Sequence, residues 1–145
     1  MSTHQRRGVA LLIALFALLL IGALVSSTLL RVQSDARLAR DAMARRRAEA
    51  GAERMIRITL ATTSSATMRA RPIGARTTST DLTGGVTTIV NVVRTDSTLA
   101  WIVATASAPS VRGTTHAQLG ASASIAPVGS ASLQLLPGDA WAQVY

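Results

Sequence analysis

An uncharged apolar run near the N-terminus constrains this chain more than any other feature. It covers residues 9–25, VALLIALFALLLIGALV, and continues without a charge through Leu30. A helix rises about 1.5 Å per residue and needs roughly 20 apolar residues to cross the hydrocarbon core of a bilayer. The run therefore predicts one membrane-spanning helix over residues 9–30.

The residues beside the run indicate an orientation. Arg6 and Arg7 precede it in a short arm, which the positive-inside rule keeps in the cytoplasm. Arginines at 31, 37 and 40 follow the run and weaken that asymmetry. Two other interpretations stay open: an ordinary secretory signal peptide cut near Thr28, and a twin-arginine signal built on Arg6 and Arg7.

The start of the chain resembles that of type IV pilin-like proteins. The stretch 5–24, QRRGVALLIALFALLLIGAL, has their short basic leader, a glycine and then an apolar helix, and AEAGAE at 48–53 resembles the helix of X-type minor pilins. The resemblance implies that a prepilin peptidase removes the basic leader peptide, residues 1–8, by cleaving after Gly8, and that the new N-terminal residue, Val9, is methylated.

One departure from the major pilins narrows the resemblance. Their fifth mature residue is a glutamate that pairs with the N-terminal amine of a neighbouring subunit, and the corresponding residue here is Ile13. X-type minor pilins and the tip pseudopilins of type II secretion also lack this glutamate. The chain therefore resembles a minor pilin or pseudopilin, a structural subunit of a type IV pilus-like or type II secretion filament.

The resemblance also implies partners and a location. The partners are other pilin-like subunits, the prepilin peptidase, an inner-membrane assembly platform and the lipid bilayer. The chain would be a single-pass protein of the inner membrane, with its C-terminal domain in the periplasm or, in a filament, outside the cell. The alternative is a single-pass anchored or signal-peptide-secreted envelope binding protein that joins no filament.

Assembly of such subunits would replace the lipid around the apolar helix with neighbouring helices. Lipid tails are as apolar as the side chains, so association depends on close packing, which small residues permit. The predicted packing positions are the small residues of the run: Ala10, Ala14, Ala17, Gly22 and Ala23.

Residues 31–60 are predicted to continue the helix as an amphipathic half. This segment has no proline and is rich in Ala, Arg, Leu, Met and Glu, which favour helix. Its only glycine, Gly51, either lets neighbouring helices approach closely or simply weakens the helix by about 1 kcal/mol relative to alanine. The triplet Arg45–Arg47 is either a solvated face or a subunit contact. Acid-first i,i+4 pairs support the helix: Asp41 with Arg45, and Glu53 with Arg57. Weaker pairs in the reverse order are Arg31 with Asp35, Arg37 with Asp41, and Arg45 with Glu49.

The remainder of the chain predicts a loop followed by a small antiparallel β-sheet domain over residues 86–145. Thr, Ser and Gly dominate residues 61–85, which are predicted to form the loop. Period-two patterns then predict strands over 86–94, 99–108 and 115–125, forming a meander on the outer half of the helix. Segments 133–136 and 141–145 are candidates for an added edge strand.

The fold class is therefore α+β: a long N-terminal helix, membrane-spanning in its first half, packed on a small antiparallel sheet. Aromatic residues make up only 3% of the chain, so the core is expected to be thin. Trp101 shares a strand side with Leu99 and Val103 and is predicted to plug that core against the helix. Trp141 and Tyr145 are expected to close the sheet edge or to contact a partner.

The inventory of reactive side chains argues against an enzyme. The chain has no cysteine and two histidines, His4 and His116, which the pattern places far apart. The helix carboxylates each have an arginine nearby and are predicted to form ion pairs. We therefore expect no catalytic residues, no metal and no cofactor.

The net charge is +8, and every basic residue of the Lys and Arg type is an arginine. Such a charge suggests a possible nucleic-acid partner. Nucleic-acid-binding proteins of this size use stacking aromatics or a recognised motif, and neither is present. We therefore expect no nucleic-acid partner.

Overall fold

The computed structural model describes residues 3–126, 132–136 and 142–143. It comprises a helical unit up to Ala39 and a compact unit that begins at Arg40. The fold class is α+β, as predicted: a long apolar N-terminal helix whose C-terminal part packs on an antiparallel sheet. This arrangement of elements is pilin-like.

Helix α1 runs without a break over Thr3–Thr62, so the helix predicted to continue through residues 31–60 is confirmed. It begins before Val9 and thus includes most of the predicted leader. A short helix, α2 (Ser65–Arg69), follows directly. Ser64 separates the two helices because its Oγ accepts a hydrogen bond from the backbone N–H of Thr67 at 3.0 Å, an N-cap.

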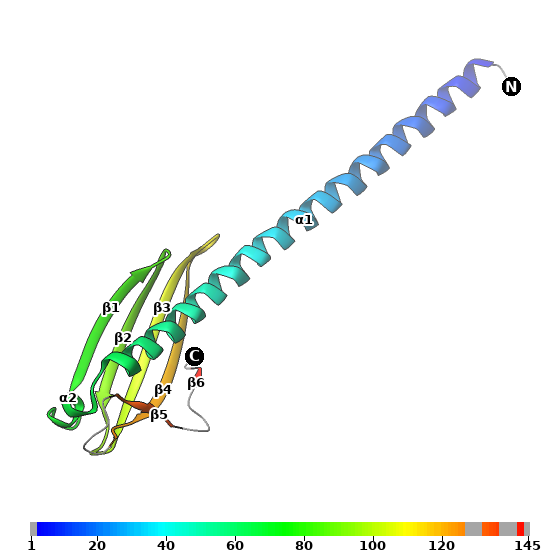
Figure 1. Ribbon diagram of the computed structural model, residues 1–145. Helices are drawn as coiled ribbons and strands as arrows, with labels where there is room; N and C mark the ends of the chain where they lie inside the picture. The colour runs from blue at the N-terminus through cyan, green and yellow to red at the C-terminus, as the bar shows by residue number, and fades with distance from the viewer. Residues whose placement is uncertain (1–2, 127–131, 137–141, 144–145) are drawn as a thin grey trace. The chain divides into compact units, whose positions relative to one another are not determined.

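Six strands are found in the described part of the chain, and four of them form an antiparallel meander (Figure 1). Two short strands, β5 and β6, both pair with β4. In chain order the strands are β1 (Arg76–Thr83), β2 (Val86–Arg94), β3 (Leu99–Ser110), β4 (Gly113–Ser124), β5 (Gln134–Leu135) and β6 (Ala142–Gln143).

The sheet is larger than the sequence predicted. Strand β2 has the predicted bounds, and the predicted strands near 99–108 and 115–125 are confirmed as β3 and β4. The prediction of a loop over 61–85 is wrong, since that region holds the end of α1, all of α2 and all of β1. Gly84 and Gly85, with φ of +61° and +75°, form the two-residue turn that pairs β1 with β2. Primed hairpin turns of this kind need positive φ at both central residues.

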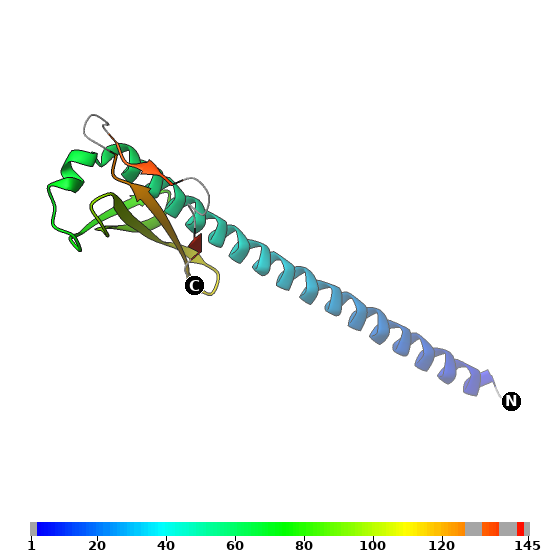
Figure 2. The ribbon, with the colours of Figure 1, turned by 90° about the horizontal axis from the view of Figure 1, so that it is seen from below.

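Within the compact unit, the C-terminal part of α1 lies along one face of the sheet in both views (Figures 1 and 2). The helix contributes Ala48, Ala52 and Ile56, which are fully buried. Beneath them, the inward positions of the central strands are mostly alanine, as the low aromatic content led us to expect. These are Ala100, Ile102, Ala104, Ala106 and Ala108 of β3, and Ala121 and Ala123 of β4.

Gly51 marks a close approach between helix and sheet. A Cβ atom placed on it would lie 2.9 Å from Cγ1 of Val86 and 3.3 Å from Oγ1 of Thr88. Distances this short leave no room for a methyl group. The close approach is thus to the sheet of its own unit, which neither interpretation of Gly51 predicted, and packing of Gly51 against a neighbouring helix stays a prediction.

The predicted position of Trp101 is wrong. In β3 the even-numbered residues are buried against the helix, while Leu99, Trp101 and Val103 are on the opposite face. Trp101 crosses Gly120 of β4, where an added Cβ would lie only 2.6 Å from the indole Cζ2 atom. The ring therefore covers the outer face of the sheet and does not plug the core. Trp141 and Tyr145 lie outside the described residues.

Candidate functional site

The apolar side chains of α1 between Leu11 and Leu30 are left uncovered by the residues that the structure describes. Their large members are between 57% and 75% exposed, Leu29 being the least and Leu11 the most. Monomeric soluble proteins rarely expose contiguous apolar patches of more than a few hundred Å². This helix is long and apolar enough to cross a membrane, as a single-pass anchor or a signal sequence would.

Three hydroxyl side chains at the end of this stretch are satisfied within the helix. Ser26 Oγ donates to the carbonyl oxygen of Gly22, and the hydroxyls of Ser27 and Thr28 donate to Leu24 and Val25, each at 2.8 Å. Burying an unpaired hydroxyl in an apolar medium costs several kcal/mol, roughly 4–8 on a cyclohexane scale. Because these donors are paired, the apolar surface can extend to Leu30, in line with the predicted span.

The predicted packing residues do not form one stripe. Positions 10, 14 and 17 follow the i, i+4, i+7 spacing and share a face of α1. Gly22 and Ala23 come five and six positions after Ala17, so at about 100° per residue they are turned away from that face, in opposite directions. Ala14, Ala17, Gly22 and Ala23 are all exposed, and no atom lies within 4 Å of a Cβ built on Gly22. The helix thus offers small residues on several sides.

Two positions were missed by the sequence interpretation. Ser26 follows Gly22 by four residues, and Ser27 follows Ala23 by four, which gives two adjacent small-xxx-small pairs. Such pairs let helix backbones approach closely in membranes. The four-residue spacing was the signal that would have identified them. Gly8 and Val9, the predicted processing residues, and Ala10 lie within the first turns of α1.

In the compact unit, Asp41 connects α1 to the β3–β4 hairpin. Its Oδ1 accepts a hydrogen bond from the backbone N–H of Val111 at 3.1 Å, and its Oδ2 lies 3.9 Å from Nε of Arg112. The predicted pair of Asp41 with Arg45 is therefore wrong, whereas the predicted reverse-order pair of Arg45 with Glu49 is confirmed, with Nε and Oε1 3.1 Å apart.

The other acid-first pair is present. Oε1 of Glu53 and Nη2 of Arg57 lie 2.5 Å apart, so this predicted pair is confirmed.

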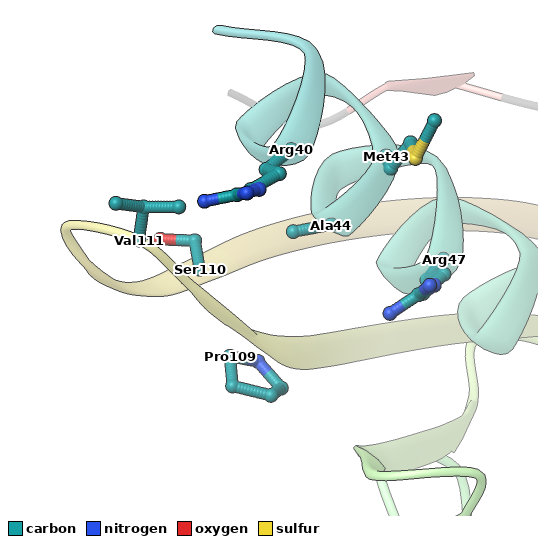
Figure 3. A pocket seen from close by; sticks show the side chains of 7 residues that line it. All are labelled: Arg40, Met43, Ala44, Arg47, Pro109, Ser110 and Val111. Atoms are coloured by element: carbon teal, nitrogen blue, oxygen red, sulfur yellow. The ribbon is translucent and has the colours of Figure 1, made fainter. Parts of the chain in front are cut away.

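Beside Asp41, a cleft opens between α1 and the hairpin (Figure 3). It has a volume of about 260 Å³. Two members of the arginine triplet differ in their surroundings: Arg45 is paired with Glu49, while Arg47 lines the cleft. The lining residues are Arg40, Met43, Ala44, Arg47, Pro109, Ser110 and Val111.

A second cleft, of about 340 Å³, lies on the outer face of the sheet next to Trp101. Leu99 and Val93 form part of its apolar lining, and Ser122 and Leu136 complete it on the β4 side. This cleft follows from the unexpected position of the indole ring.

Among the described residues, no group of three or more His, Asp or Glu side chains is placed to hold a metal ion. Comparison with models of protein families, with curated proteins and with solved structures finds no match to this chain.

Proposed function

We propose that this chain is a minor pilin-like or pseudopilin structural subunit. It would be inserted as a precursor in the inner membrane, cut after Gly8 by a prepilin peptidase and methylated on Val9. An inner-membrane assembly platform would then add it to a type IV pilus-like or type II secretion filament beside other pilin-like subunits. Its role would be structural and not catalytic.

One observation carries the proposal: a single unbroken helix joins an uncovered apolar stretch to a segment packed on a sheet. The stretch 11–30 needs lipid or other helices around it, whereas the segment from Ala44 to Thr59 already buries one side within its own unit. A subunit that moves from a bilayer into a helical filament has both needs. The basic residues and glycine before the run supply a leader of the kind that a prepilin peptidase removes.

The N-terminus of the mature protein tests the proposal directly. Mass analysis of the chain purified from membranes should give a first residue of Val9, carrying one methyl group. A first residue near Thr28 would instead indicate an ordinary signal peptide, and an intact Met1 or Ser2 a simple anchor. Either of these results would contradict processing as a pilin.

Assembly is tested separately, through the small residues of the helix. Gly22→Leu and Ala17→Leu should leave membrane insertion intact and prevent incorporation into sheared filaments, because bulk at these positions keeps neighbouring helices apart. Val25→Leu is the matched control, since it enlarges a side chain that is already large. Normal incorporation of the Gly22 and Ala17 variants would contradict helix packing through these residues.

The cleft at Trp101 supports a second candidate function, an anchored or secreted envelope binding protein. The partly exposed indole of Trp101, which lies against Gly120, offers an aromatic contact surface, and such aromatic residues often anchor partners. This candidate predicts no cleavage after Gly8, so the same N-terminal analysis separates it from the filament subunit.

A further inference from the structure

The strongest unassigned feature of the compact unit is the cleft between α1 and the β3–β4 hairpin. Arg40 and Arg47 are seven residues apart, about two turns of helix or roughly 10 Å. Both line the cleft and flank Ala44, which is small enough to leave the floor open (Figure 3). The opposite wall is Pro109, Ser110 and Val111.

The two arginines differ from four others in their unit. Arg45, Arg54, Arg57 and Arg112 each lie within 4 Å of a carboxylate oxygen. In the part of the chain that the structure describes, neither Arg40 nor Arg47 forms such an ion pair. The cleft therefore presents two guanidinium groups, and these are suited to bidentate binding of a carboxylate or a phosphate.

The acidic group closest in sequence does not neutralise the cleft. Asp41 is held by the backbone N–H of Val111 and lies beside Arg112. These contacts fasten the hairpin to the helix and so fix the far wall of the cleft. The far wall of the cleft is thus fixed before any ligand arrives, which lowers the ordering cost of binding.

We propose that this cleft binds an acidic side chain of a different protein subunit, with Arg40 and Arg47 holding its carboxylate. This inference rests on the proposed function, since it names the partner of a subunit in an assembly. The volume of about 260 Å³ is several times the roughly 30 Å³ that one water occupies. A glutamate or aspartate side chain therefore fits, and Met43 at the rim offers a soft surface for its methylene groups.

A second copy of this chain is a poor occupant. Residues 31–47 contain six arginines and two aspartates, so two copies packed through this segment would place like charges together. Glu49 and Glu53, the next acids along the helix, already pair with arginines. Charge complementarity thus favours a distinct, acidic subunit.

Anionic lipid is also a poor occupant. The headgroup layer adds only about 5–7 Å to each side of the hydrocarbon core. Arg40 is ten residues beyond Leu30, about 15 Å of helix, and Arg47 is farther still. By sequence spacing alone, more residues separate Arg40 and Arg47 from the apolar stretch than the headgroup layer needs.

Fluorescence anisotropy of a labelled hexaglutamate peptide tests the site on the full-length protein in phosphatidylcholine nanodiscs. The double variant Arg40→Gln/Arg47→Gln should weaken binding about tenfold or more, because each lost contact is a charged hydrogen bond. Arg37→Gln/Arg46→Gln removes the same charge from outside the cleft and should weaken binding less than about threefold. A hexaglutamine peptide should not bind.

Several results would overturn the assignment. Equal losses in the two double variants would show diffuse charge attraction, and no loss in the first would place binding elsewhere. If Arg40 and Arg47 were instead needed for binding to phosphatidylserine vesicles, or for self-association in neutral nanodiscs, the occupant would be lipid or a second copy. The peptide assay needs neither cleavage nor assembly, so its failure is distinguishable from failure of the filament proposal.

Discussion

Replacing Gly51 by alanine tests how closely α1 approaches its sheet. The new Cβ would lie 2.9 Å from Cγ1 of Val86 and 3.3 Å from Oγ1 of Thr88. Both neighbours are on the buried face of β2, at 8% and 2% exposed, so neither side chain can swing into solvent. The added methyl must push helix and strand apart or force Val86 from its rotamer.

Two effects of opposite sign decide the result. Alanine is favoured over glycine in a helix interior by about 1 kcal/mol. Overpacking a core typically costs about 1–3 kcal/mol. The second effect is larger, so we expect Gly51→Ala to lower the free energy of unfolding by about 1 kcal/mol.

The assay is urea unfolding of the full-length protein in detergent micelles, followed by tryptophan fluorescence. Val86→Ala removes the Cγ1 atom that the new methyl would meet. In that background Gly51→Ala should stabilise by up to about 1 kcal/mol, a reversal of sign. Ala50→Gly, at an exposed neighbouring position, should cost about 1 kcal/mol and calibrates helix propensity. Stabilisation by Gly51→Ala in the otherwise unchanged protein would refute the close contact.

Two further substitutions test contacts in the sheet. Gly120→Ala should displace the indole of Trp101, shift its fluorescence to longer wavelength and lower the free energy of unfolding by about 1–2 kcal/mol. In a Trp101→Ala background this loss of stability should vanish, and its persistence would place the strain elsewhere. Asp41→Ala should remove the acceptor for the N–H of Val111 at a cost of about 1 kcal/mol and speed hydrogen exchange of that amide. Arg112→Ala should leave the amide protected, because the exposed Arg112 pair adds little, and equal exchange in the two variants would contradict this ranking.

The sequence predicted elements well wherever one side of a segment is buried. In β2, residues 86, 88, 90 and 92 are buried and alternate with more exposed ones, and the predicted bounds were correct. Strand β1 was missed because neither of its sides carries an apolar pattern. Its sequence, RTTSTDLT, has one large apolar residue, Leu82, which is 73% exposed. Pairing of this edge strand depends on the glycine turn at 84–85 and on β2, so periodicity within β1 could not reveal it.

The side assigned to Trp101 was wrong for a related reason. Strand β3 carries apolar residues on both sides: larger ones at 99, 101 and 103, and mostly alanines at the even positions. Size favours the first set as core, since large side chains bury more apolar area. The helix approaches closely, however, and on β3 the side chains beneath it are small except for Ile102. The choice between the two sides was therefore set by the helix, which lies far away in the sequence.

The ion pairs of the helix were predicted from i,i+4 spacing alone, and the predicted pairs that form are ones in which both partners lie on the helix. Glu53 with Arg57 needs nothing beyond one helix face, and it is present. Asp41 instead bonds to the hairpin tip, seventy positions later in the chain. A backbone N–H that would otherwise lack a partner competes well with an exposed arginine, whose ion pair contributes at most about 1 kcal/mol. The cleft beside Asp41 could not be foreseen for the same reason.

The small residues on both sides of the helix–sheet interface account for the unusual composition. Ala48 and Ala52 on α1 share one buried core with alanines on β3 and β4, so methyl groups and backbone supply much of the contact. Substitutions that shrink side chains remove little volume from such an interface, because truncating alanine to glycine removes a single methyl group. The same interface has no free space for larger side chains, since protein interiors are close-packed. We therefore expect this unit to tolerate substitutions that shrink buried side chains better than those that enlarge them. If the apolar stretch 11–30 packs against neighbouring helices, that packing also depends on small residues. The stability of the compact unit and the proposed assembly would then both require a helix backbone to approach its neighbour closely.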